Sequence, residues 1–120
     1  MQQLQIPPLA EGEVYIGAIG NKSGDFYHVV LLPDDHECDT HAAATEWAKN
    51  IGGDLPNRIE QAMLWDGHRE LFQKDWYWSN STYERNDAYA WRQYFGSGSQ
   101  ITSHKDNSNC RARAVRRLPI

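Results

Sequence analysis

Residues 76–118 read WYWSNSTYERNDAYAWRQYFGSGSQITSHKDNSNCRARAVRRL, and the fold depends on this stretch more than on any other. Nine of the fourteen aromatic residues fall between Phe72 and Phe95. Because large aromatic side chains bury the most apolar area per residue, a hydrophobic core is expected to grow here.

Alternation between apolar and polar residues predicts a succession of short strands in this stretch. One strand is predicted at residues 76–78 and another at 88–95. The glycines of 96–98 separate the second strand from the run at 99–102, which is the composition of a hairpin with a Gly-containing loop. A last strand is predicted over residues 110–118, with its alanines packed against the tryptophans.

The first third of the chain predicts an arm, a hairpin and a loop. Residues 1–11 are polar and include two adjacent prolines, which is typical of an arm or linker. Apolar residues alternate or cluster in 12–20 and again in 26–32, and the turn residues between them predict a β-hairpin. Residues 33–39 are polar and are predicted to form a loop.

Two helices are predicted between this hairpin and the aromatic stretch. The first runs over 40–51 and is capped by Asp39 or Thr40. The second begins after Asn57, whose side chain is expected to form a capping box with Glu60. The buried face of the second helix is predicted to contain Ile59, Ala62, Met63 and Trp65.

The order strand, strand, helix, helix and then further strands predicts an α+β fold built from local hairpins. A chain of 120 residues suffices for one core but not for two ordinary domains, so 12–120 is expected to be a single domain.

No apolar run approaches the roughly 20 residues that span a bilayer, and the N-terminal residues lack the regions of a signal peptide. Cytoplasmic synthesis and no membrane partner are therefore expected.

The net charge of −4 is distributed unevenly along the chain. Residues 1–60 carry three cations and ten acids, whereas residues 61–120 carry nine cations and six acids. An acidic surface repels nucleic acid, so nucleic acid is not an expected partner, although such a surface can also imitate it.

Metal and thiol chemistry has few candidates in this chain. His36, Cys38 and His41 lie within six residues, but their spacing matches no common zinc motif. Cys38 and Cys110 are expected to be free thiols, with a bridge between them left open. Two groups of side chains suit calcium but are better explained as turn formers: Asn80, Glu84, Asn86 and Asp87, and Asp106, Asn107 and Asn109. No metal, cofactor or catalytic residue is predicted.

Five motifs follow one another in the chain: Gly52-Gly-Asp-Leu-Pro-Asn-Arg-Ile-Glu60, Trp76-Tyr-Trp-Ser79, Tyr89-Ala-Trp91, the glycine turn at 96–98, and Arg111-Ala-Arg-Ala-Val-Arg-Arg117. In this order they resemble the Lcl C-terminal-domain family over residues 12–118. The resemblance implies a fold similar to C-type lectins and formylglycine-generating enzymes. Such a fold has an N-terminal hairpin, two helices and then antiparallel strands, and the two termini of the chain are adjacent. Small members of the family are frequent in phages and prophages.

The resemblance implies a non-catalytic, lectin-like binding domain of phage or prophage type, in the host cytoplasm or in the virion. Its ligand is expected to be a protein or a glycan, and a host protein is one candidate. Loops often host binding sites, and exposed Tyr, Arg and Asn are effective contact residues, so the 80–104 loops are predicted to recognise the ligand. The predicted contact residues are Tyr77, Asn80, Tyr83, Glu84, Arg85, Asn86, Asp87, Tyr89, Arg92, Gln100 and His104.

Other side chains are assigned to the scaffold. Trp78 and Trp91 are excluded from the contact residues because alternating tryptophans usually belong to a core. Arg113 resembles an arginine that recurs in the final strand of the related fold, which implies a hydrogen-bonding brace beneath the sheet. Alternation in the last strand predicts that Arg116 points away from Arg117.

A second hypothesis assigns the function to the acidic half of the chain. In this hypothesis the protein is a small phage-encoded inhibitor that binds a host defence protein. Acidic side chains would steer the association, and the predicted surface consists of Asp34, Asp35, Glu37 and Asp39.

Overall fold

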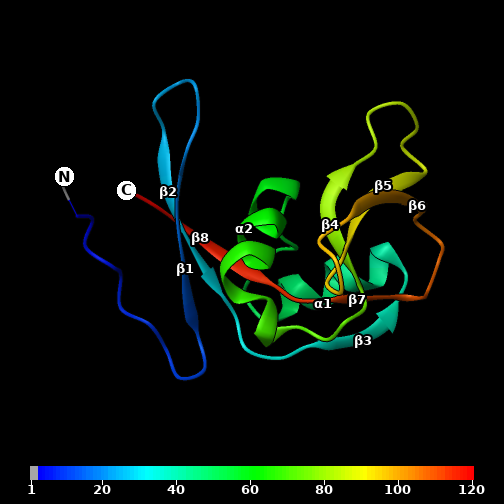
Figure 1. Cartoon of the computed structure of the whole chain (residues 1–120), viewed down its shortest axis with the longest axis horizontal. Helices are drawn as coiled ribbons and strands as arrows, with labels where there is room; N and C mark the ends of the chain where they lie inside the picture. Colours follow the sequence, from blue (N-terminus) through cyan, green and yellow to red (C-terminus); the bar gives the residue numbers. More distant parts are fainter. Residues whose placement is uncertain (1–2) are drawn as a thin grey trace.

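The computed structural model describes residues 3–120 and contains two α-helices and eight strands within them (Figure 1). Residues 1 and 2 of the predicted arm lie outside the described residues. The arrangement confirms the predicted α+β class. The elements are β1 (Val14–Gly20), β2 (Phe26–Leu31), β3 (His36–Asp39), α1 (His41–Asn50), α2 (Arg58–His68), the 3-10 turn η1 (Arg69–Leu71), β4 (Trp76–Thr82), β5 (Tyr89–Tyr94), β6 (Gln100–His104), β7 (Cys110–Ala112) and β8 (Val115–Pro119).

The strands form two sheets. The smaller sheet has the antiparallel order β1-β2-β8, so the first and last strands of the chain share a sheet. The larger sheet has the order β3-β7-β4-β5-β6, in which only β4 and β7 are parallel among the described strands. Helix α2 lies between the β1–β2 hairpin and strands β4 to β6 (Figure 1). It therefore contacts both sheets.

Both helices begin at the predicted caps. Thr40 accepts a hydrogen bond from the backbone N–H of Ala43 at the start of α1. Asn57 and Glu60 form the reciprocal capping box at the start of α2. Beyond the end of α1, Gly52 has a φ of +88°, a left-handed conformation that other residues resist. None of the described helices is long and apolar enough to cross a membrane.

The core consists of two clusters on opposite faces of the larger sheet. Trp78 and Tyr77 are consecutive in β4 and therefore point to opposite faces, where each is fully buried in a different cluster. The Trp78 cluster also contains Leu32, Ala44, Ala48, Leu55, Ala90, Cys110, Ala112 and Ala114. The Tyr77 cluster also contains Val29, Leu31, Leu64, Phe95 and Val115. The aromatic stretch thus contributes to the core, as predicted, although Tyr77 was predicted to be a contact residue.

Helix α2 buries its predicted face only in part: Met63 and Trp65 are half-buried, and Trp65 packs against the Tyr77 cluster. Ile59 is 62% exposed and Ala62 is exposed, whereas Glu60 and Gln61 are fully buried beside Leu64. The prediction that Ile59 and Ala62 face the core was therefore wrong. The helix presents these two apolar side chains to solvent on the side of the larger sheet's β5–β6 hairpin.

Specific partners explain why α2 buries polar side chains. Gln61 donates its amide to two consecutive carbonyls of β4, at 3.1 and 3.2 Å. Glu60 accepts two hydrogen bonds of 2.7 Å from Arg117 on β8, and Arg117 also bonds Asp54 at 2.8 Å. Buried polar groups are tolerated when they are paired in this way. The pairing ties α2 to both sheets.

Three strands differ from their predicted extents. Residues 36–39 form β3, which pairs with β7, although residues 33–39 were predicted to be a loop. Strand β4 continues to Thr82 instead of ending at residue 78. The predicted strand over 110–118 is two strands, because the chain passes from the larger sheet to the smaller one between β7 and β8. Pairing with strands distant in sequence decides the first and the third, and pairing with the neighbouring strand β5 decides the second.

Arg113 lies at this crossing between the sheets. Its guanidinium donates to the carbonyl of Leu71 at 2.8 Å and to that of Leu32 at 2.9 Å. It thereby links η1, the end of β2 and the β7–β8 junction, which agrees with the expected bracing role. Arg116 points to Glu13 and Arg117 to Glu60, so these neighbours do face opposite ways.

Candidate functional site

The predicted recognition loop, residues 80–87, lies at the surface. Asn80 and residues 84–87 are exposed, and Tyr83 is half-buried. Backbone hydrogen bonds close the loop, from Tyr83 N–H to Tyr89 at 2.8 Å and from Tyr89 N–H to Asn86 at 3.0 Å. The loop therefore has a defined shape that presents polar side chains to solvent.

Three of the four predicted residues of the β5–β6 pair, Tyr89, Gln100 and His104, share one face of the sheet. Tyr89 pairs with His104, and their rings pack edge to face with centroids 5.2 Å apart. Gln100 pairs with Gln93 on the same face, which is the face toward α2. The structure thus brings Tyr89, Gln100 and His104 together with the loop, as the sequence predicts.

Two predicted contact residues lie elsewhere. Tyr77 is 1% exposed in the core, so its predicted place at the surface is corrected. Arg92 is half-buried on the opposite face of β5, where its guanidinium lies 4.1 Å from the ring of Trp76 and 3.7 Å from the sulfur of Cys110. Side chains alternate between the two faces of a strand, so Arg92 lies on the face opposite to Tyr89, Gln100 and His104.

Trp91 was assigned to the core, but it is half-buried beside the recognition loop. Its indole N–H donates to Glu84 at 3.3 Å, and Tyr83 packs against it edge to face at 5.7 Å. The guanidinium of Arg58 lies 3.5 Å from the ring centroid, which is a close cation–π contact. Trp91 therefore connects the loop to the start of α2.

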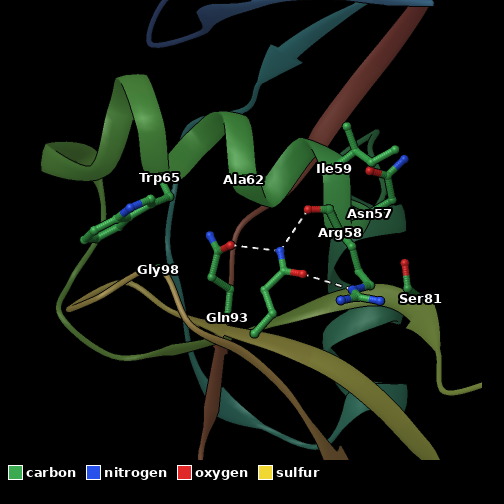
Figure 2. Close-up of a pocket in the computed structure, with 9 residues that line it drawn as sticks. Asn57, Arg58, Ile59, Ala62, Trp65, Ser81, Gln93 and Gly98 are labelled. Carbon is green, nitrogen blue, oxygen red and sulfur yellow. Dashed lines mark hydrogen bonds between the residues drawn. The ribbon is translucent and has the colours of Figure 1, made fainter. Parts of the chain in front are cut away.

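A groove of about 800 Å³ lies between α2 and the β5–β6 hairpin, and Figure 2 shows its lining side chains. Most of the exposed lining is apolar. The wall on α2 includes Ile59 and Trp65, and the indole of Trp65 lies against Gly98, where a Cβ would be only 2.6 Å from it. The lining residues are Asn57, Arg58, Ile59, Ala62, Trp65, Ser81, Gln93, Gly98 and Gln100.

A chain of side-chain hydrogen bonds orders the groove floor. Gln100 donates to Gln93 and to the carbonyl of Arg58, both at 2.9 Å, and accepts from the guanidinium of Arg58 at 2.9 Å (Figure 2). Gln93 in turn donates to the carbonyl of Gln61 at 2.6 Å. The orientation of Arg58 in the groove is therefore set by the sheet beneath it.

Most of the groove was missed at the level of sequence, although Gln100 was predicted. Ile59, Ala62 and Trp65 carry only their apolar character as a signal, and helical periodicity assigns apolar residues to a core. The burial of Glu60 and Gln61 turns Ile59 and Ala62 outward, and that burial depends on partners in β4 and β8.

Electrostatics at the loop keep Glu84 ionised. Its own backbone N–H and the indole of Trp91 lower the pKa of Glu84, with smaller effects from Arg58 and Arg85. Glu84 forms no ion pair with Arg58 in the described part of the chain. The loop therefore presents a carboxylate and the groove presents a separate cation.

The four acids of the second hypothesis do not form one free surface. Asp35 accepts a hydrogen bond of 2.8 Å from Arg111 and another from the hydroxyl of Tyr77. Asp39 accepts the backbone N–H of Thr40 at 2.8 Å. Asp34 and Glu37 are exposed. Half of the predicted acidic surface thus has internal partners.

The candidate metal ligands have structural contacts. His36 stacks on Trp47 at 4.9 Å, and Cys38 and Cys110 are free thiols. Asn86 and Asn107 each accept the backbone N–H two residues ahead, as turn-forming amides do. Among residues 3–120, no three His, Cys, Asp or Glu side chains converge on one point.

His41 provides a prediction about pH. Its ring donates to the carbonyl of Ser79 at 2.8 Å and packs on Trp78, and burial lowers the pKa of His41 below its ordinary value near 6.5. At a pH between the lowered pKa of the folded protein and the ordinary pKa of the unfolded chain, the unfolded chain binds more protons than the folded protein. The free energy of unfolding should therefore fall as the pH is lowered through about 6.5.

This prediction is tested by denaturant unfolding between about pH 5 and pH 8, the range in which a histidine titrates. His41→Gln retains a donor for the Ser79 carbonyl but cannot titrate, so its stability should depend less on pH than that of the wild type. Equal pH dependence in the two proteins would show that His41 does not titrate differently in the folded state.

No protein-family model and no curated protein matches this chain.

Proposed function

We propose that this protein is a non-catalytic, C-type-lectin-like binding domain of phage or prophage type that recognises a protein or a glycan. Its binding face consists of loop 80–87, the α2-facing side of β5–β6 and the groove. The groove is the observation that carries this proposal, because exposed apolar side chains beside ordered polar groups are typical of recognition sites. The resemblance to the Lcl C-terminal-domain family supports the same assignment.

The composition of the binding face suits recognition. Trp65, Trp91 and Tyr83 offer flat aromatic surface, and Asn80 and Glu84 offer exposed polar groups. Such side chains combine apolar contact with hydrogen bonding at low entropic cost. The alternative acidic surface is less favoured, since Asp35 and Asp39 already have partners within the protein.

The proposal predicts that Ile59→Asp abolishes binding while the fold is retained. Ile59 is exposed in the first turn of α2, where an added carboxylate is compatible with the helix. The probes are a glycan array and a displayed library of random linear peptides. Wild-type protein should bind members of at least one of them, and Ile59→Asp should weaken that binding roughly tenfold or more.

Ile6→Asp is the matched control, because Ile6 is 55% exposed in the arm, outside the binding face. Its binding should equal that of the wild type. If both probes bind equally well to Ile59→Asp, or if neither probe binds the wild type, the groove is not the binding site proposed here.

A further inference from the structure

Strand β6 is an edge of the larger sheet, because it pairs only with β5 among the described strands. The backbone bonds Tyr94 N–H to Ser99 and Lys105 N–H to Ala88 show which antiparallel pairs exchange hydrogen bonds. By this alternation Gln100, Thr102 and His104 direct their backbone N–H and C=O groups away from β5.

These outward groups are largely unused. Asn107 donates its N–H to the carbonyl of His104, whereas the outward backbone groups of Gln100 and Thr102 have no backbone partner within residues 3–120. An extended segment from another chain can pair with such groups, as in β-strand addition. The edge of β6 therefore presents backbone N–H and C=O groups, at Gln100 and Thr102, with which a further strand can pair.

The edge and the groove meet at Gln100. Its side chain lines the groove, and Thr102 lies opposite Trp91, on whose ring Arg58 rests. A strand added to β6 would direct alternate side chains toward this face, because side chains alternate across a sheet. An apolar side chain there has the groove wall at Ile59 to contact.

Arg58 is the charged group of this face. Its Nε–H is held by Gln100 at 2.9 Å, and one side of its guanidinium covers the ring of Trp91. It belongs to no ion pair among residues 3–120, and its terminal nitrogens bond no described side chain. A guanidinium fixed on two sides beside an apolar wall is complementary to a carboxylate.

We propose that β6 binds an extended peptide segment of a partner protein, in which an acidic residue lies among apolar ones. The segment continues the sheet beyond β6, its carboxylate contacts Arg58, and a neighbouring apolar side chain enters the groove beside Ile59. The inference rests on the proposed binding function and narrows its ligand from a protein or glycan to an acidic, apolar peptide strand.

The test begins with selection of random linear 12-residue peptides on the wild-type protein. Enriched peptides should contain Asp or Glu flanked by apolar residues. For a synthetic copy of one such peptide, Arg58→Gln should weaken binding roughly tenfold or more, whereas Lys22→Gln in the distant β1–β2 turn should not. Replacing the acid of the peptide by its amide should weaken binding to the wild type but not further to Arg58→Gln.

N-methylation of the peptide tests the strand geometry without any change to the protein. Methylation of amides that face β6 should abolish binding, and methylation of the alternate amides should be tolerated. Enriched peptides without an acid, an unchanged affinity for Arg58→Gln, or no alternation in the methylation series would each overturn the inference. If only glycans bind, and Ile59→Asp prevents it, the peptide inference fails while the binding function stands.

Discussion

Replacing Arg117 by methionine should lower the free energy of unfolding by about 3 to 5 kcal/mol, because it leaves a buried carboxylate without its cation. Glu60 is fully buried, and Arg117 donates two hydrogen bonds to it. The two hydrogen bonds to Glu60, and then the one to Asp54, raise the pKa of Arg117, so this guanidinium is always charged. Urea denaturation of the wild type and the variant measures the difference.

Two further variants make this result specific. Glu60→Gln combined with Arg117→Met removes both charges and keeps an acceptor for the capping bond to Asn57, so most of the lost stability should return. Arg116→Met is the matched control on the same strand. It removes the pair with Glu13 and a 3.2 Å hydrogen bond to the carbonyl of Pro8, and it should cost about 1 kcal/mol or less. If the Arg116 and Arg117 variants lost equal stability, the buried pair would not be the reason.

Tyr77→Ala should cost about 3 to 5 kcal/mol, the usual range for removal of a buried aromatic ring. The ring of Tyr77 packs edge to face on Phe72 and Phe95, with centroids 5.1 Å away in both cases. Burial, and then the bond to Asp35, raise the pKa of Tyr77, so the phenol keeps its proton and donates to Asp35.

Tyr77→Phe and Tyr83→Ala divide this effect into its parts. Tyr77→Phe keeps the packing but leaves Asp35 and the backbone N–H of Gln73 without the hydroxyl, which should cost about 1 to 3 kcal/mol. Tyr83 is half-buried in the recognition loop, and its truncation should cost less than that of Tyr77. Thermal unfolding of the three variants gives the order, and a Tyr77→Ala protein as stable as Tyr83→Ala would place Tyr77 at the surface after all.

Part of the binding site could be predicted because it depends on local features. Loop 80–87 is polar and lies between two aromatic strands, so its exposure follows from composition. The exposure of Ile59 and the position of Trp91 beside the loop could not be predicted in the same way. Ile59 is turned outward by the partners of Glu60 and Gln61, and Trp91 is covered by Arg58 from a different element.

The sequence by itself determined the features that depend on a few neighbouring residues. The hairpins, the capping box of Asn57 and Glu60, and the end of α1 before Gly52 all follow from turn chemistry, capping and periodicity. These interactions join residues that are close in the chain, so the neighbouring residues are sufficient to specify them.

The tertiary structure alone decided which polar segments pair and which polar side chains are buried. The polar strand β3 exists because β7 pairs with it, and the last strand divides because β7 and β8 join different sheets. Arg117 lies 57 positions from Glu60, and their contact turns Ile59 into the groove. Such contacts lower the free-energy cost of burying polar groups. The pattern of hydrophobic residues along the sequence does not reveal them.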